Sequence, residues 1–463
     1  TPVVIVIPVR ALPLKRESSM MNPVGIFELF KRYTVALSLV LMLFAPAATG
    51  HAFGRTSSTP IPSSAPSDSL STRDRVEIFE EIWEIIDEKY YDPTFNGVDW
   101  RAVRDRYRPL AAEAEGEEQF YSLLKRMVGE LRDAHTRFHT PEERRERERE
   151  QAVSVGLSIF EVEGKSVIVG VDADSEAARA GVEPGMIVLS VDGQPIDQRL
   201  KEARLRVAGS SSDRAITLRV YRMIVGGDTG TILRMRLARA DGSTLDVALT
   251  RRVVSDAPTV TSRRLPSGMG YIRLTLWKSP IRKQFKRALE QLRYAPGIVI
   301  DIRGNPGGEA GEVVKIASLF FDSHVSFGKF STRGGRSVYL RTDDDEQIYK
   351  GPVAILVNEG SGSGSELFAG VMQENRRAVV IGRQSCGCVL GISKFRSLKG
   401  KGELAVSEFG YRSPQGKTFE GSGVTPDRKV ELKLADLQHG RDAALDEAER
   451  LLKTNNGSKV AQR

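Results

Sequence analysis

Three serines alternate with glycines in segment 358–366, which reads Asn-Glu-Gly-Ser-Gly-Ser-Gly-Ser-Glu. An apolar run, Val353 to Val357, precedes this segment, and apolar residues at helical spacing follow it. A short turn between a buried strand and a helix exposes a hydroxyl and places the next backbone N–H beside it, as a nucleophilic serine requires. A Ser-Gly repeat can also be a flexible loop, but the flanking strand and helix favour an ordered turn. The sequence therefore predicts a serine nucleophile here.

A second glycine-rich turn, Asp-Ile-Arg-Gly-Asn-Pro-Gly-Gly at 301–308, follows the apolar run that begins at Gly297. Glycines let backbone N–H groups approach a ligand closely, which a site for an oxyanion requires. Glycine-rich strand ends also bind phosphates, so this segment alone leaves the ligand open.

The segments that carry these turns alternate between strand and helix. Between residues 254 and 456, apolar strands alternate with amphipathic helices, which predicts an α/β core. We expect strands at 271–274, 297–303, 353–357 and 378–381 and a helix at 284–292. Residues 73–150 are expected to be helical, because Phe79, Ile82 and Ile86 recur at helical spacing.

Residues 151–253 contain short β-rich runs separated by turns. The string Ala-Gly-Val-Glu-Pro-Gly-Met at 180–186, followed by Val-Asp-Gly, resembles the PDZ domain of bacterial proteases. The resemblance implies that Val155, Gly156, Leu157 and Ser158 form the carboxylate loop. Its N–H groups would capture the C-terminal carboxylate of a peptide that adds as a strand. The alternative is an unrelated small β-domain.

Several motifs in order carry a wider resemblance, over roughly residues 75–455. After the helical segment and the PDZ-like part come the turn at 301–308, the serine turn, and Glu-Gly-Ser-Gly-Val-Thr-Pro-Asp at 420–427. This order resembles the carboxyl-terminal processing (tail-specific) proteases, and it implies a crotonase-like α/β peptidase core. The family pattern places the nucleophile on Ser363. It places the oxyanion hole on the N–H of Gly364 and on one from Gly307 or Gly308.

The residue that serves as general base in that family has no counterpart at the matching position of this chain. A lysine is expected where this chain has Cys388, and a glutamine where it has Ile392. A thiol with a pKa of about 8.5 is a poor proton acceptor for a serine hydroxyl unless it is already ionised. The usual Ser-Lys dyad is therefore absent.

Three interpretations follow. In the tricorn-like branch of the superfamily, a histidine is the base and a glutamate supports it, which here implies Ser363, His135 and Glu420. Tricorn-like enzymes place a serine before that histidine, whereas this chain has Ala134. Alternatively, Lys394 reaches the serine, or the protein is an inactive peptide-binding scaffold that keeps the PDZ domain and the cleft.

The N-terminus predicts export. Lys31 and Arg32 precede an apolar run at 33–47, and small residues follow, which is the order of a secretory signal peptide. An uncleaved membrane anchor is the alternative, and it would allow membrane association. We therefore expect a periplasmic or cell-envelope protein. We divide the chain into a signal peptide with an upstream extension (1–52), a Ser/Thr/Pro-rich linker (53–72), a helical region (73–150), a PDZ domain (151–253), a peptidase core (254–456) and a tail (457–463).

The composition of the chain limits which kinds of partner and cofactor we expect. The chain has 463 residues, with 68 basic and 60 acidic ones and a formal charge of +8. Because the charges are mixed along the chain, we do not expect nucleic-acid binding. The two cysteines, Cys386 and Cys388, fit no zinc pattern. We expect them to pack as small apolar groups, with a redox pair as the alternative. His139 and His439 lie in polar segments and are expected at the surface. No metal or organic cofactor is implied.

The function expected is an exported serine endopeptidase that cleaves unstructured C-terminal regions of proteins. Its substrates would be captured through their C-termini by the PDZ domain.

Overall fold

The computed structural model of the chain describes residues 5–6, 70–207, 209–343 and 349–460, and these residues belong to one compact unit. Almost all of the predicted signal peptide and linker lie outside the described residues. No described helix is both long enough and apolar enough to cross a membrane.

The N-terminal helices pack around a core of their own. Ile78, Phe79, Ile82 and Ile86 lie on one face of the first helix and are buried, as their spacing predicted. The elements are α1 (Thr72–Lys89), η1 (Phe95–Gly97), α2 (Trp100–Glu113), α3 (Glu117–Gly129), β2 (Arg137–His139) and α4 (Pro141–Glu148).

Strand β2 is a departure from the predicted all-helical character of this region. It pairs with β20 (Glu403–Ala405), far along the chain. Local spacing cannot reveal such a pairing, because the partner strand is remote in sequence. This pairing fixes the segment that carries His135, just before β2.

A small β-rich part follows. Its main sheet has the order β4-β5-β6-β8-β9, so β4 lies at an edge, and α7 packs against β4. The elements are β3 (Gln151–Ser154), β4 (Leu157–Val162), β5 (Lys165–Val171), α5 (Glu176–Arg179), β6 (Ile187–Val191), β7 (Gln194–Pro195), α6 (Ile196–Arg206), α7 (Asp213–Val225), β8 (Ile232–Ala238), β9 (Thr244–Thr250) and β10 (Arg252–Ser255). Strands β3 and β10 pair with each other at the two ends of this part.

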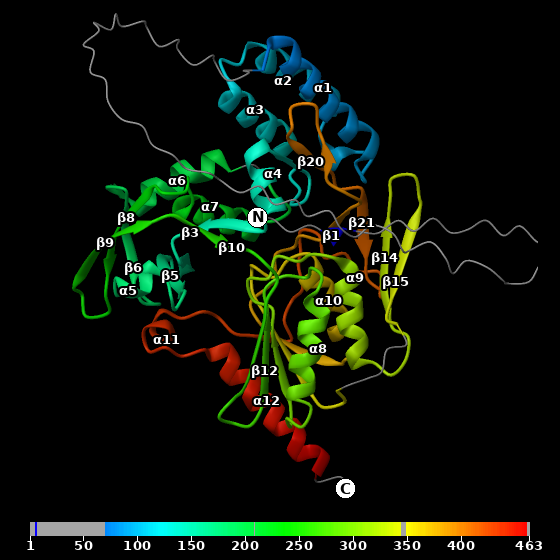
Figure 1. Cartoon of the computed structure of the whole chain (residues 1–463). Coiled ribbons are helices and arrows are strands. Elements are labelled where there is room, and N and C mark those ends of the chain that lie inside the picture. The colour runs from blue at the N-terminus through cyan, green and yellow to red at the C-terminus, as the bar shows by residue number, and fades with distance from the viewer. Residues whose placement is uncertain (1–4, 7–69, 208, 344–348, 461–463) are drawn as a thin grey trace, which may run out of the picture. The chain divides into compact units, whose positions relative to one another are not determined.

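The sheet of the α/β core has the order β11-β12-β13-β16-β17-β22, and every pair except β11 with β12 is parallel. Side chains alternate between its two faces: Ile298 and Ile300 join the core under α8, α9 and α10, whereas Val299 joins the core under α12. Figure 1 shows α8, α9 and α10 side by side over one face. Because both faces are covered, the strands read as continuous apolar runs.

The elements of this sheet and its covering helices are β11 (Val260–Arg264), β12 (Gly270–Leu274), α8 (Ile281–Gln291), β13 (Ile298–Asp301), α9 (Ala310–Ala317), η2 (Ser318–Phe320), β16 (Val353–Val357), α10 (Gly364–Glu374), β17 (Ala378–Gly382), β22 (Arg428–Lys429) and α12 (Ala443–Val460). The expected strands and helix of the core are confirmed to within a few residues.

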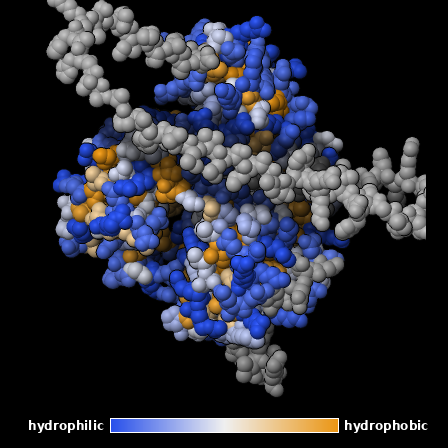
Figure 2. Space-filling model, viewed as in Figure 1, coloured by the Kyte–Doolittle hydropathy of each residue, from blue (hydrophilic) through white to orange (hydrophobic). Residues whose placement is uncertain are grey.

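Smaller sheets complete the described chain. Their elements, with one short helix, are β1 (Ile5–Val6), β14 (Ser326–Ser331), β15 (Ser337–Arg341), β18 (Leu390–Ile392), β19 (Arg396–Ser397), β21 (Phe409–Arg412) and α11 (Leu434–Gln438). On the face seen in Figure 2, apolar side chains of the described residues gather in small groups within a mainly hydrophilic surface. Leu205 and Tyr294 are among the most exposed of the large ones.

Candidate active site

The three serines of the turn have different partners. Ser361 donates to the carbonyl of Ile302 (2.8 Å) and accepts from the N–H of Asn358 (3.0 Å). Ser365 donates to the carbonyl of Asn305 (2.9 Å) and accepts from the indole N–H of Trp277 (2.9 Å). These two hydroxyls tie the serine turn to the turn at 301–308, so they are engaged in structure.

The hydroxyl of Ser363 faces a histidine instead. Its Oγ lies 3.2 Å from Nε2 of His135, and both residues are buried. Ser363 is the residue before α10 and has φ 53° and ψ −113°. A non-glycine residue in such a region costs about 1–3 kcal/mol, and this kind of strain is typical of functional turns. The predicted nucleophile position and one predicted base are thus brought together.

His135 is held by the turn that precedes β2. The Oδ1 atom of Asp133 accepts from the N–H groups of His135 (2.7 Å) and Thr136 (2.6 Å) and from the hydroxyl of Ser407 (2.9 Å). Ser407 follows β20, the partner strand of β2. Both sides of this pairing therefore position the histidine.

Burial lowers the pKa of His135 to about 4; Asp133 opposes this shift, and Arg137 adds to it. At neutral pH the ring is therefore uncharged and can accept a proton at one nitrogen.

Glu420 lies near the turn that carries His135, but within the described residues no hydrogen bond joins its carboxyl group to the histidine ring. Its Oε2 accepts from the N–H of Val389 at 2.5 Å, and its carboxyl also interacts with the hydroxyl of Ser211. That hydroxyl accepts from the N–H of Ala134, so Glu420 supports the backbone beside the histidine. Burial raises the pKa of Glu420 to about 8, with a further contribution from Asp133.

Two backbone N–H groups near Ser363 have no hydrogen-bond acceptor within the described chain: those of Gly364 and Gly308. The N–H of Gly307 donates to Oδ1 of Asn305 at 3.0 Å, so of the two expected glycines Gly308 is the one with a free donor. A side chain at Gly308 would collide with the carbonyl of Trp277, 2.1 Å from the position of its Cβ. Glycine is therefore required at 308. At Gly307 a Cβ would lie 2.5 Å from the Cβ of Ser363, so glycine there lets the loop approach the serine turn closely.

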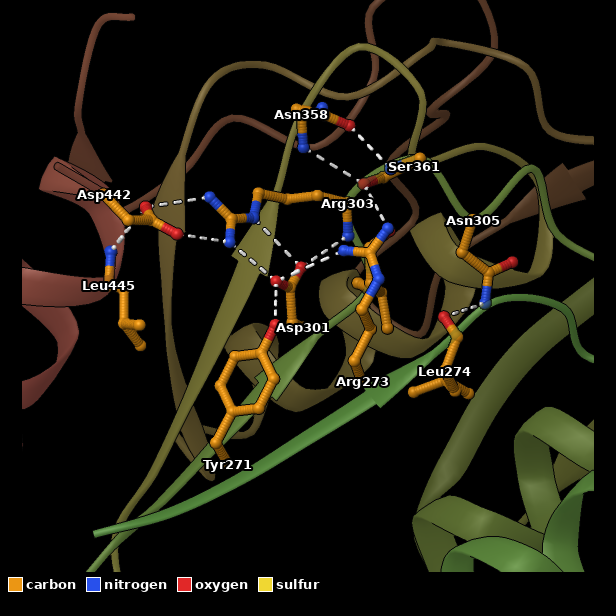
Figure 3. A network of polar contacts seen from close by, with 12 residues as sticks. Tyr271, Arg273, Leu274, Asp301, Arg303, Asn305, Asn358, Ser361, Asp442 and Leu445 are labelled. Atoms are coloured by element: carbon orange, nitrogen blue, oxygen red, sulfur yellow. Dashed lines mark hydrogen bonds and ion pairs between the residues drawn. The ribbon is translucent and has the colours of Figure 1, made fainter. Parts of the chain in front are cut away.

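A buried polar network holds the turn at 301–308 (Figure 3). Asp301 accepts from the hydroxyl of Tyr271 (2.7 Å) and from the guanidinium of Arg303 (2.6 Å), and Arg303 also binds Asp442 (2.7 Å). Burial alone would raise the pKa of Asp301, but Arg303 and Arg273 keep it below its usual value. In Figure 3 the amide of Asn305 reaches the carbonyl of Leu274, which anchors the loop to β12.

Glu366, the last residue of segment 358–366, has a role that the sequence did not predict. Its buried carboxylate accepts from the N–H groups of Ser363 (2.9 Å), Gly387 (2.7 Å) and Cys388 (2.9 Å) and from the hydroxyl of Ser385 (2.6 Å). Glu366 thereby joins the backbone of Ser363 to the segment of the two cysteines. The spacing Ser-x-x-Glu before an apolar run is a helix-start signal that would have pointed to it.

The chain matches three family models. Peptidase family S41 matches residues 268–430, the tricorn protease C1 domain matches residues 71–129, and a PDZ domain matches residues 167–222.

Known proteins agree with these matches. The chain is 30% identical over 375 residues to carboxyl-terminal-processing peptidase 2, chloroplastic, of Arabidopsis thaliana, covering 76% of this chain and 68% of that protein. It is 28% identical over 402 residues to a carboxyl-terminal-processing protease of Synechocystis sp., covering 82% and 88%.

Among solved structures, the photosystem II D1 C-terminal processing protease matches with a TM-score of 0.55 and 25% identity, over 82% of this chain and 97% of that one. Mature CPAF shares the fold, with a TM-score of 0.64 and 13% identity, over 84% and 98%.

The chain belongs to peptidase family S41. It is a serine-type peptidase of the carboxyl-terminal-processing kind and carries a PDZ domain. The resemblance inferred from the order of its motifs is therefore confirmed.

Within this family, the segment around Cys388 is the departure. Cys386 and Cys388 are buried and joined by a disulfide, so the expectation of two separately packed thiols was wrong. The two cysteines lie outside the strands, between β17 and β18, and Gly387 between them has φ 76°, a backbone conformation that favours glycine. We call residues 385–388 the cysteine turn. Neither cysteine is then a thiol that accepts a proton.

Lys394, the other alternative base, has an exposed side chain, and no hydrogen bond joins it to Ser363 within the described residues. His139 was expected at the surface, but it is only 5% exposed and packs against Phe395. The polar sequence around His139 was misleading because β2 is covered by β20 and its neighbours. His439 is exposed, as expected. No cluster of potential metal ligands occurs among the described residues.

The PDZ domain contacts the cysteine turn through the start of α7. The hydroxyl of Ser212 donates to the carbonyl of Cys386 (2.5 Å), and Arg214 donates to the carbonyls of Ser385 (2.8 Å) and Ser422 (2.8 Å). In the expected carboxylate loop, the N–H of Gly156 donates to the hydroxyl of Ser154 (2.9 Å). A peptide carboxylate would have to displace that hydroxyl to use this donor.

Proposed function

We propose that this S41 peptidase is an exported endopeptidase that hydrolyses peptide bonds in unstructured C-terminal regions, with Ser363 as nucleophile and His135 as base. The observation that carries the proposal is the contact of 3.2 Å between Ser363 Oγ and His135 Nε2. Ser361 and Ser365 are engaged elsewhere, and the position of the family lysine holds a disulfide-bonded cysteine.

The reaction follows from this geometry. Ser363 Oγ attacks the carbonyl carbon of the substrate while its proton passes to Nε2 of His135. The oxyanion that forms receives the N–H groups of Gly364 and Gly308. Collapse of the intermediate expels the amine, which takes the proton from His135, and an acyl ester remains on Ser363. Water then hydrolyses the ester by the same route in reverse.

Substrate delivery uses the PDZ domain. Strand β4 lies at the edge of its sheet with α7 beside it, which is the arrangement that accepts a peptide as an added strand. Val155 and Gly156 directly precede β4, and Leu157 and Ser158 begin it, so the C-terminal carboxylate of that peptide would end at this segment. Export is supported by the predicted signal peptide and by the family.

A second candidate function is a peptide-binding scaffold without catalysis. The observation in its favour is the loss of the family lysine to Cys388. The two functions share the PDZ groove and differ only at Ser363 and its base.

The test is cleavage of an unfolded protein with an accessible C-terminal tail. We expect the protein to cleave it, and the variants S363A and H135A to lose about 10⁴-fold or more in kcat. K394A should retain activity, because Lys394 is exposed and away from the serine. Equal, negligible cleavage by the wild-type protein and S363A would overturn the enzyme in favour of the scaffold. Loss of activity in K394A but not in H135A would show that Lys394, and not His135, is the base.

A further inference from the structure

Among the described residues, two buried polar atoms of the turn that carries His135 have no hydrogen-bond partner. They are Nδ1 of His135 and Oδ2 of Asp133, and each residue is 2% exposed. An unpaired buried polar group costs about 1–3 kcal/mol. Such a cost at a functional site calls for an explanation, and here the two atoms belong to residues only two positions apart.

The chemistry of the base defines what Nδ1 needs. If Nε2 takes the proton of Ser363, the neutral ring must carry its own proton on Nδ1. A proton on a buried nitrogen needs an acceptor, and that acceptor fixes the tautomer and the orientation of the ring.

The two carboxylate oxygens of Asp133 differ in their hydrogen bonds. Its Oδ1 is occupied by the N–H groups of His135 and Thr136 and by the hydroxyl of Ser407. These three bonds hold the carboxylate on the turn that carries the histidine, and they leave Oδ2 open. The charge of Asp133 acts on the ring, since it opposes the loss of basicity that burial causes.

We propose that Asp133 is the positioning residue of His135: its Oδ2 accepts the Nδ1–H of the ring when substrate engages, and its charge stabilises the imidazolium formed during the reaction. The proposal rests on the role of His135 as base. It assigns to Asp133 the part that the family resemblance implied for Glu420.

Glu420 is less suited to this part. Its oxygens are engaged by Val389 and Ser211. Because its pKa is raised to about 8, it is largely protonated at neutral pH and brings no counter-charge to an imidazolium.

Other groups face the same carboxylate. The guanidinium of Arg137 is buried on β2, and one of its terminal nitrogens has no partner. The hydroxyl of Tyr90, at the end of α1, accepts from Asn96 and also interacts with Asp133, so Tyr90 is the competing donor. Besides Oδ2 of Asp133, the hydroxyl oxygen of Ser210 is also buried and has no partner among the described residues. The test therefore includes Tyr90 and Ser210.

The first measurement is kcat and KM for D133N, E420Q, S210A and Y90F. The asparagine side chain in D133N would keep an oxygen for the three bonds of Oδ1 but present an amide N–H₂ to Nδ1. We expect D133N to lower kcat about 10²–10⁴-fold with KM changed less than about threefold, in line with loss of the orienting acid in a serine triad. The matched control is S407A, which removes one bond to Oδ1 without changing charge and should stay within about tenfold of the wild type. A loss in E420Q or S210A that D133N does not share would overturn the proposal.

The second measurement does not depend on catalysis. With ¹⁵N-histidine in the full-length S363A protein bound to an unfolded tail peptide, the ring nitrogens of His135 are observed at neutral pH and assigned by comparison with H135Q. We expect the proton on Nδ1 when Asp133 is present, and a shift towards the Nε2–H tautomer in D133N. An unchanged tautomer in D133N would overturn the role of Asp133. If the tautomer shifts while the wild-type protein cleaves nothing, the proposed function fails and the positioning of His135 stands.

Discussion

At the scale of single residues, hydrogen-bond partners distinguish three serines that look alike in sequence. Ser361 and Ser365 donate to carbonyls of the neighbouring turn, whereas Ser363 faces His135. The backbone of Ser363 is also in a region that non-glycine residues rarely occupy. The neighbours of each hydroxyl, and not its chemistry, thus separate structural serines from the candidate nucleophile.

This difference predicts separable effects of alanine substitution. S361A leaves the N–H of Asn358 without its partner, and S365A does the same to the indole N–H of Trp277, so each should lower the free energy of unfolding by about 1–3 kcal/mol. Both should still react with a fluorophosphonate probe, whereas S363A should not react and should unfold near the wild-type midpoint. Urea unfolding and probe labelling measure the two effects. Labelling of S363A at the wild-type level would show that another residue is the nucleophile.

At the scale of elements, Glu366 links the first turn of α10 to the cysteine turn. Its carboxylate receives four donors, two of them from Gly387 and Cys388. Burial raises the pKa of Glu366, and these hydrogen bonds counteract the shift. The cysteine turn therefore occupies the position of the family lysine and at the same time holds the backbone of Ser363 through Glu366.

Replacement of this carboxylate tests the link. In E366Q one oxygen becomes N–H₂, which cannot accept, so at least one buried donor loses its partner. We expect a loss of about 1–3 kcal/mol in unfolding free energy and a lower kcat with little change in KM, because the N–H of Ser363 loses its fixed position. The matched control is E374Q at the other end of α10, where the carboxylate accepts from Ser413. Equal losses of kcat in the two variants would contradict a specific role for Glu366.

At the scale of the whole molecule, Glu420 lies where three parts of the chain meet. It contacts Val389 of the core and Ser211, which precedes α7, and in its ionised form it attracts Arg137 of β2. Its pKa is raised from 4.5 to about 8, so the folded protein keeps a proton that the unfolded chain has already released. Stability from this group is complete below about pH 4.5 and is lost as the pH rises towards 8.

The pKa of His135 is shifted in the opposite direction to that of Glu420. Its pKa is lowered from 6.5 to about 4, so its contribution is complete above about pH 6.5 and is lost as the pH falls towards 4. A comparison between wild type and a single variant is therefore needed to isolate Glu420.

Replacement of Glu420 by glutamine removes the carboxyl group that titrates. The stability of E420Q relative to the wild-type protein should increase from pH 5 to pH 8, because only the wild type loses stability as Glu420 ionises. Urea midpoints at several pH values measure this difference, and E118Q, at an exposed position, should show no such trend. A difference between E420Q and wild type that does not vary with pH would contradict the raised pKa.

Much of the architecture could be predicted from sequence, because its signals are local. The apolar runs of β12, β13, β16 and β17, the glycine-rich turns at their ends and the order of motifs all lie within short stretches. The PDZ domain and the S41 family followed from that order. What was missed, such as strand β2, the burial of His139 and the Cys386–Cys388 disulfide, depends on segments that pack together only in the folded chain.

By itself the sequence determined the family, the serine turn and the absence of the usual lysine. Tertiary structure decided which hydroxyl faces the ring of His135, because Ser363 and His135 are 228 residues apart and contacts such as the pairing of β2 with β20 bring the histidine to its place. It also left Gly308 rather than Gly307 with a free N–H. Burial, which no local pattern encodes, set the opposite pKa shifts of His135 and Glu420.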